Sequence, residues 1–155
     1  MVTPFTYTAD STVQDVVKVS LASFNAARGN YSAVREDKLT TKETRVHLRA
    51  VMAARHNEGL KAAAIARALE TLDSGYTMAT TLEEAKELLA DPLDNAWFLL
   101  NREQTAIDRC NMPADSTFGN IMDINRRHYS DRYMVLEAAD RALSALTDGR
   151  LAVTA

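Results

Sequence analysis

Residues 41–73 read TKETRVHLRAVMAARHNEGLKAAAIARALETLD, with one glycine, no proline and many alanine, leucine and arginine residues. These residue types lose little side-chain freedom in a helix. The stretch predicts one long central helix, or two helices that meet near Gly59, because glycine inside a helix costs about 1 kcal/mol relative to alanine. Thr40 and Glu43 have the spacing of a capping box that would start this helix.

The rest of the chain predicts shorter helices packed around residues 41–73. Their expected ranges are 12–28, 81–90 and 92–111, followed by a last helix that Asp115 or Ser116 caps and that runs through 147, because Gly29, Pro92, Pro113 and Gly149 follow or interrupt the apolar patterns. The predicted fold is therefore an all-α, single-domain bundle of about five helices. It comprises an extended N-terminal arm (1–11), a helical domain (12–148) and a C-terminal tail (149–155).

Capping residues and apolar spacing support these helices. Thr81 and Glu84 form a second expected capping box, and Asp91 before Pro92 predicts a separate helix start. Trp97, the single tryptophan, is expected to anchor the core. In the last helix the expected buried side contains Ile121, Ile124, Val135, Leu136, Leu143 and Leu146.

Composition limits the class of protein. The chain has 155 residues, of which 46% are hydrophobic and 25% charged, and its formal net charge is −3. A single cysteine, Cys110, cannot form an internal disulfide, which favours a reducing compartment. The sequence lacks both the pattern of a signal peptide and an apolar run long enough to span a membrane. We expect a protein of the cytoplasm, or of a particle assembled in a host cytoplasm, with no membrane partner.

The N-terminal arm carries Phe5 and Tyr7, which alternate with threonines as in an extended segment. Two interpretations stay open. The arm folds back over its own core, or it docks on a neighbouring subunit.

Charge is unevenly distributed along the chain. Residues 35–67 hold eight basic and four acidic residues, whereas residues 68–95 hold one basic and seven acidic residues. Three interpretations stay open: two solvated faces, complementary faces on neighbouring subunits, or a basic face that contacts phosphate. The candidate basic face comprises Lys42, Arg45, Arg49, Arg55 and Arg67; the candidate acidic face comprises Glu83, Glu84, Glu87, Asp91 and Asp94.

The sequence shows no recognisable set of catalytic or metal-binding residues. Its three histidines, His47, His56 and His128, lack metal-ligand spacing, and no glycine-rich phosphate loop or nucleophile elbow occurs. Cys110 follows Arg109 and is a candidate for proximity to His128, without an assigned role. We expect no enzyme activity, no metal and no cofactor.

One segment resembles a DNA-binding motif. GLKAAAIARALETL, residues 59–72, resembles the first helix of a helix-turn-helix, which a recognition helix should follow. The expected next helix, 81–90, contains Glu83, Glu84 and Glu87, which phosphate would repel.

These patterns favour a non-enzymatic interaction or assembly protein. The expected role is a small structural subunit of a larger homo-oligomer, such as a virus or phage particle, with other protein subunits as partners. The alternative is a nucleic-acid-associated helical regulator that uses the basic face of residues 42–67.

Overall fold

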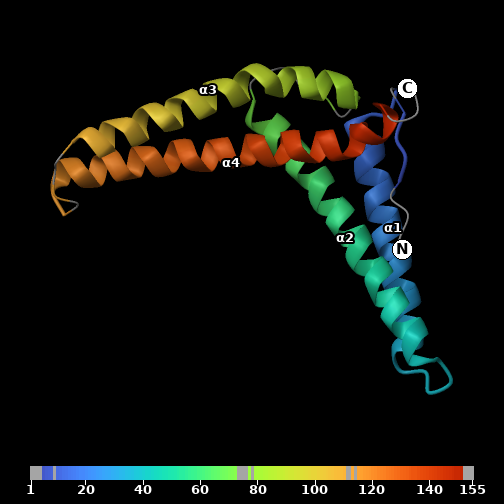
Figure 1. Cartoon of the computed structure of the whole chain (residues 1–155). Coiled ribbons are helices and arrows are strands. Elements are labelled where there is room, and N and C mark those ends of the chain that lie inside the picture. Colours follow the sequence, from blue (N-terminus) through green and yellow to red (C-terminus); the bar gives the residue numbers. More distant parts are fainter. Residues whose placement is uncertain are drawn as a thin grey trace.

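The structure is a computed structural model that describes residues 5–8, 10–72, 77, 79–110, 113 and 115–151, with side chains up to Thr147. These residues form four helices: α1 (Val13–Arg35), α2 (Lys42–Thr71), α3 (Leu82–Arg109) and α4 (Thr117–Leu151). Figure 1 shows that α1 with α2, and α3 with α4, make two hairpins whose open ends meet in an L. The all-α prediction is confirmed, but the described part of the chain has four helices, not five.

The starts of α1 and α3 are tied together where the hairpins meet. Thr12 and Thr81 each cap their helix through a capping box, with Asp15 and Glu84 as the reciprocal partners. Thr12 and Thr81 also form an isolated antiparallel bridge, in which the Val13 N–H donates to the Thr80 carbonyl at 3.0 Å. The expected cap at Thr81 is therefore confirmed, and it lies next to the cap of α1.

The first two helices are longer or more continuous than the glycine positions indicated. The predicted stop at Gly29 is wrong, because α1 continues to Arg35. Buried Ala27 and half-buried Tyr31 and Val34 hold this last part against α2. Along α2, the helix passes through Gly59 without a break.

The start of α2 lies one residue later than the expected capping box. Thr41, not Thr40, is the N-cap, and its side chain accepts from the Thr44 N–H at 3.2 Å. Thr40 instead donates its hydroxyl to Asp37 in the preceding turn, at 2.8 Å. The expected end at Ser74 and Gly75 lies outside the described residues.

The predicted separation of helices 81–90 and 92–111 is also wrong. They form one helix, α3, with Pro92 inside it, and α3 is bowed along its length in Figure 1. Proline in a helix interior costs about 3 kcal/mol. The buried residues Leu89 and Ala96 lie on either side of Pro92, so packing against α4 on both sides offsets this cost.

The final helix extends beyond its expected end. Of the two expected caps, Asp115 and Ser116, it is Ser116 that begins the helix, because its hydroxyl accepts from the Gly119 N–H at 3.0 Å. α4 then continues past Thr147 to Leu151, so the predicted tail from residue 149 starts too early. Residues 152–155 lie outside the described part of the chain.

One buried cluster joins all four helices where the hairpins meet. Its largest fully buried side chains are Ile65 and Leu69 of α2, Leu82 and Leu89 of α3, Leu136 and Leu143 of α4, and Val13 and Val16 of α1. Contacts between α2 and α4 hold the two hairpins together, whereas α2 touches α3 only slightly. We call this cluster the elbow core.

Several residues expected in the core are exposed. Trp97 is 55% exposed, Ile121 51% and Ile124 65%. All three lie within residues 97–135 of the α3–α4 hairpin, where none of the described residues is buried. A two-helix hairpin buries only the sides that face each other, so the prediction of these residues as core is wrong.

Candidate interaction surfaces

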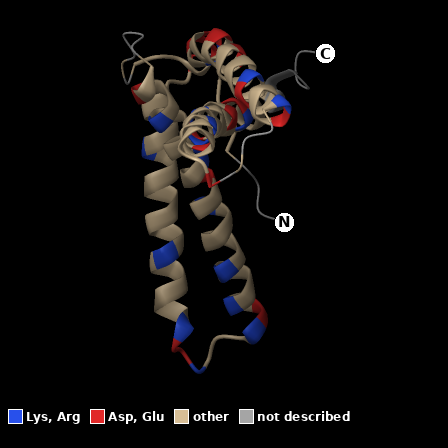
Figure 2. Cartoon of the chain, turned by 90° about the vertical axis from the view of Figure 1, so that its left-hand side faces the viewer, with Lys and Arg blue, Asp and Glu red and all other residues tan. Residues whose placement is uncertain are grey.

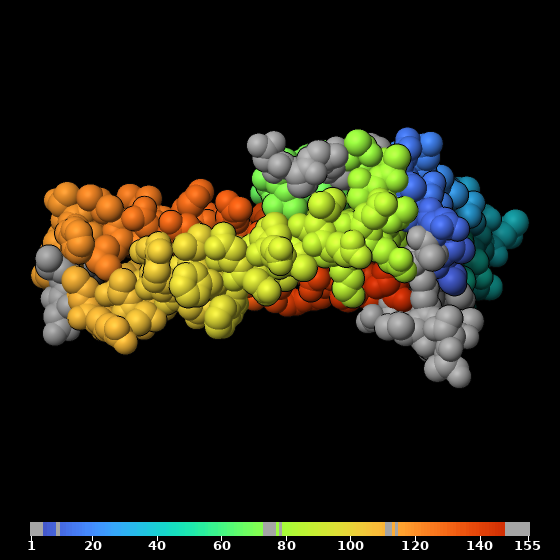
Figure 3. Space-filling view, turned by 90° about the horizontal axis from the view of Figure 1, so that it is seen from above, coloured from blue at the N-terminus to red at the C-terminus, as the bar shows by residue number. Residues whose placement is uncertain are grey.

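The outer parts of both hairpins have almost no buried core of their own. Among the described residues, none between 36 and 61 and none between 97 and 135 is buried. Six exposed large apolar side chains lie on the second hairpin: Trp97, Phe98, Phe118, Ile121, Ile124 and Met134. Seen from above in Figure 3, the α3–α4 hairpin extends well beyond the place where the first hairpin meets it.

The total accessible surface reflects this open shape. The chain exposes 10435 Å². A compact monomer of 17.1 kDa exposes about 7,750 Å². The surplus, about a third of that value, is larger than the ~800 Å² that one partner contributes to a standard protein interface.

The N-terminal arm packs on its own chain. Tyr7 belongs to the elbow core and is 6% exposed, and burial raises the pKa of its hydroxyl. The Arg55 guanidinium lies 4.2 Å from the centre of the Phe5 ring and forms an ion pair with Glu58 at 3.1 Å. The structure thus places both candidate arm residues against this chain, as the fold-back interpretation expects.

The candidate basic residues have different environments on α2. Lys42, Arg49 and Arg67 are exposed, whereas Arg55 is held by Phe5 and Glu58. The Arg45 guanidinium is half-buried and donates to the Thr40 carbonyl at 3.0 Å. The three exposed basic residues are therefore the ones available to a partner. Figure 2 shows Lys and Arg along the α1–α2 hairpin, with acidic residues gathered near its tip.

These exposed basic residues belong to one continuous row on α2. Eight exposed residues recur at alternating steps of four and three, which keeps them on one face of a helix. We call this set the α2 row: Lys42, Val46, Arg49, Ala53, His56, Leu60, Ala63 and Arg67. Val46 and Leu60 within it are 60% and 54% exposed, so the row is both basic and apolar.

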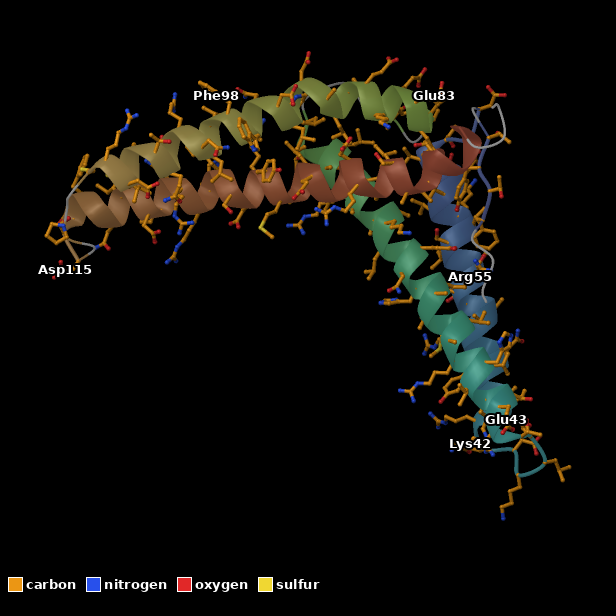
Figure 4. All side chains as sticks on the ribbon, in the orientation of Figure 1. Lys42, Glu43, Arg55, Glu83, Phe98 and Asp115 are labelled. Carbon is orange, nitrogen blue, oxygen red and sulfur yellow. The ribbon has the colours of Figure 1, made fainter. Side chains whose placement is uncertain are left out.

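The candidate acidic residues are all exposed on α3, and four of them belong to a similar row. Seven exposed residues again recur at steps of three and four, and we call them the α3 row: Glu84, Glu87, Asp91, Asp94, Phe98, Asn101 and Thr105. Phe98 is 59% exposed. Glu83 and Phe98 lie on the side of α3 that faces away from α4 (Figure 4). The label on Phe98 thus places this part of the α3 row on the side of α3 away from α4.

An apolar groove of about 380 Å³ lies between α1 and α2, next to the α2 row. Its lining includes Leu21, Phe24, His56, Gly59, Leu60 and Ala63. The Phe24 and His56 rings in this lining contact each other, with centres 5.4 Å apart and ring planes tilted by 49°. A Cβ atom added at Gly59 would meet nothing within 4 Å, so the groove is open at this position.

The titratable residues do not form a metal-binding cluster in the described part of the chain. No group of three or more His, Cys, Asp or Glu side chains there could hold a metal ion. Cys110 ends α3, whereas His128 lines a hollow beside Thr71 at the end of α2, so the structure does not bring them together. Among the described helices, none has the length and apolar character needed to cross a membrane.

Comparison of the chain with protein-family models, with curated proteins and with solved structures gives no match.

Sequence reasoning identified the charges but not the rows. The steps of four and three in the α2 row mix basic, small and apolar residues, so they do not stand out as an apolar stripe. Phe98 was not a candidate because its neighbour Trp97 was assigned to the core. The available signal was the seven-residue spacing of Lys42, Arg49, His56 and Ala63, which becomes informative only once this side of α2 is known to be exposed.

Proposed function

We propose that this chain is a non-enzymatic assembly protein, a small structural subunit that packs against further copies of itself. The observation that carries the proposal is the pair of outer hairpin segments without a buried core. Burying apolar surface contributes roughly 25 cal/mol per Å². Copies that cover these segments would recover part of the stabilisation that the isolated chain lacks.

The shape and surface of the chain support this role. Large apolar patches on soluble proteins usually mark interaction sites, and six exposed large apolar residues lie on the α3–α4 hairpin alone. A subunit with two projecting hairpins offers each neighbour a separate surface, which suits the virus or phage particle expected from the sequence.

The test is the oligomeric state of the purified chain. Size-exclusion chromatography with light scattering, and sedimentation velocity over a range of concentrations, should show assemblies larger than a monomer. Electron microscopy of the largest assembly then tests the particle hypothesis. A monomer at every concentration, up to the high micromolar range, overturns the proposal.

A second candidate function is binding to nucleic acid through the basic face of α2. The observation that favours it is the exposure of Lys42, Arg49 and Arg67 on one face. Double-stranded DNA should then retain the chain at low salt and release it at higher salt. Arg49→Glu with Arg67→Glu should abolish this retention, and a parent chain that never binds DNA removes the candidate.

A further inference from the structure

The two hairpins carry opposite net charge. Residues 13–71, which form α1 and α2, contain ten basic and six acidic residues, a balance of +4. Residues 82–147 of the second hairpin contain seven basic and twelve acidic residues, a balance of −5. When two copies meet, contact between like hairpins brings charges of the same sign together, and these repel each other. Contact between unlike hairpins brings opposite charges together, and these attract each other.

Each hairpin also presents one row suited to such a contact. The α2 row combines Lys42, Arg49 and Arg67 with exposed Val46 and Leu60. The α3 row combines four carboxylates with exposed Phe98. Both rows have the alternating three- and four-residue steps by which helices pack side by side in coiled coils.

We propose that the α2 row of one copy packs against the α3 row of a second copy. The proposal rests on the function proposed above and adds to it the two faces that join. Opposite charges set the choice of partner face, as the charged flanking positions of coiled coils do. Phe98 and Leu60 contribute apolar area within the same contact.

The groove beside the α2 row favours this arrangement. It opens next to His56, Leu60 and Ala63 of the row, and its lining is largely apolar. Small side chains at Gly59 and Ala63 allow another helix to approach the α2 backbone closely. The α3 row has in Phe98 a single large apolar side chain, which can contact this groove when the rows meet.

A contact between two different faces leaves one face of each copy unused. The first copy offers its α3 row to a third copy, and the second copy offers its α2 row in the same way. Such head-to-tail contacts produce a closed ring or an open filament, depending on whether the rotation between copies closes. The contact is therefore capable of building an extended structure from one kind of chain.

Exchanging the charges of the two rows tests the proposal directly. The first variant carries Lys42→Glu, Arg49→Glu and Arg67→Glu, so both of its rows are acidic. The second carries Glu87→Lys, Asp91→Lys and Asp94→Lys, so its α2 row stays basic and its α3 row becomes net positive. Glu84 is left unchanged because its carboxylate accepts from the Thr81 N–H and caps α3.

Each variant alone should associate with itself roughly tenfold or more weakly than the parent, because like-charged or unbalanced rows then face each other. An equimolar mixture of the two should regain assembly, since each supplies the row that matches the other. A chain with all six substitutions should also assemble by itself. Lys18→Glu with Arg28→Glu, on exposed positions of α1 outside both rows, is the control and should assemble like the parent.

Sedimentation velocity measures assembly, and far-UV circular dichroism confirms that every variant is folded. If the parent is a monomer, the proposed function fails together with this inference. If the parent assembles and the two row variants assemble equally well, only the pairing of these rows is wrong. Loss of assembly in both variants without recovery in the mixture also overturns the pairing, because the rows would then not face each other.

Discussion

Substitution of Gly29 and Gly59 by alanine tests whether α1 and α2 are unbroken helices, with Gly119 of α4 as the contrast. A Cβ atom added at Gly29 or Gly59 would meet nothing within 4 Å. Alanine is about 0.8–1.0 kcal/mol more favourable than glycine inside a helix. Gly29→Ala and Gly59→Ala should therefore each raise the free energy of unfolding by about 1 kcal/mol, which corresponds to an increase of roughly 2–4 °C in Tm.

Gly119 provides the matched contrast within the first turn of α4. A Cβ atom there would lie 2.6 Å from the Pro113 carbonyl oxygen and 3.0 Å from the Ser116 hydroxyl. The carbonyl belongs to the backbone, so the loop itself has to move. Overpacking of this kind costs about 1–3 kcal/mol, which outweighs the gain in helix propensity. Gly119→Ala should therefore lower stability by about 1 kcal/mol.

Urea unfolding, followed by circular dichroism at protein concentrations where the parent is monomeric, measures all three variants. Equal slopes of the unfolding curves would show that the substitutions change stability rather than the unfolded state. A loss of stability in Gly59→Ala comparable to that in Gly119→Ala would refute the reasoning. It would mean that α2 bends, or is closely contacted, at Gly59.

The remaining predictions concern the elbow core, the helix caps and acid stability. Leu69→Ala should lower the free energy of unfolding by about 2–5 kcal/mol because Leu69 is fully buried. Trp97→Ala should change the stability of the monomer by no more than about 0.5 kcal/mol because Trp97 is exposed; a larger loss in urea unfolding would place it in the core. Thr81→Ala removes the cap of α3 and should cost about 1 kcal/mol, which the same unfolding curves measure. Hydrogen bonds from Thr12 hold the pKa of the Asp15 carboxyl below 3.8. The stability that the Asp15 carboxylate contributes is therefore present above the pKa of the unfolded state, and it is lost as the pH falls through the lower pKa of the folded state. Between about pH 5 and pH 2, the unfolding midpoint should fall less steeply with decreasing pH in Asp15→Asn than in the parent. An unchanged slope would contradict this prediction.

The class of fold and several helix starts could be predicted from local sequence. Capping depends on residues within one turn, so Thr81 with Glu84 and Ser116 were recognised from spacing alone. Helix ends and interruptions were predicted poorly. Gly29 and Pro92 weaken a helix locally, but neighbouring buried residues on both sides hold α1 and α3 together.

The location of the core could not be read from apolar spacing. The periodicity of Ile121 and Ile124 resembles that of Leu136 and Leu143, yet only the latter pair is buried. The difference is the number of helices that surround each position. That number follows from the crossing of α2 over α4, a contact between residues far apart in the sequence. For the same reason, the charges of the candidate surfaces were predictable and the rows that contain them were not.

The bridge between Thr12 and Thr81 has a consequence for the order in which the chain folds. Each hairpin joins helices that are neighbours in the sequence, so its contacts close short loops and form early. The bridge and the elbow core join residues of different hairpins, which lie far apart in the sequence. They are therefore expected to form after the contacts within each hairpin. We therefore expect the docking of the two helix pairs, which completes the elbow core, to be the slow step of folding.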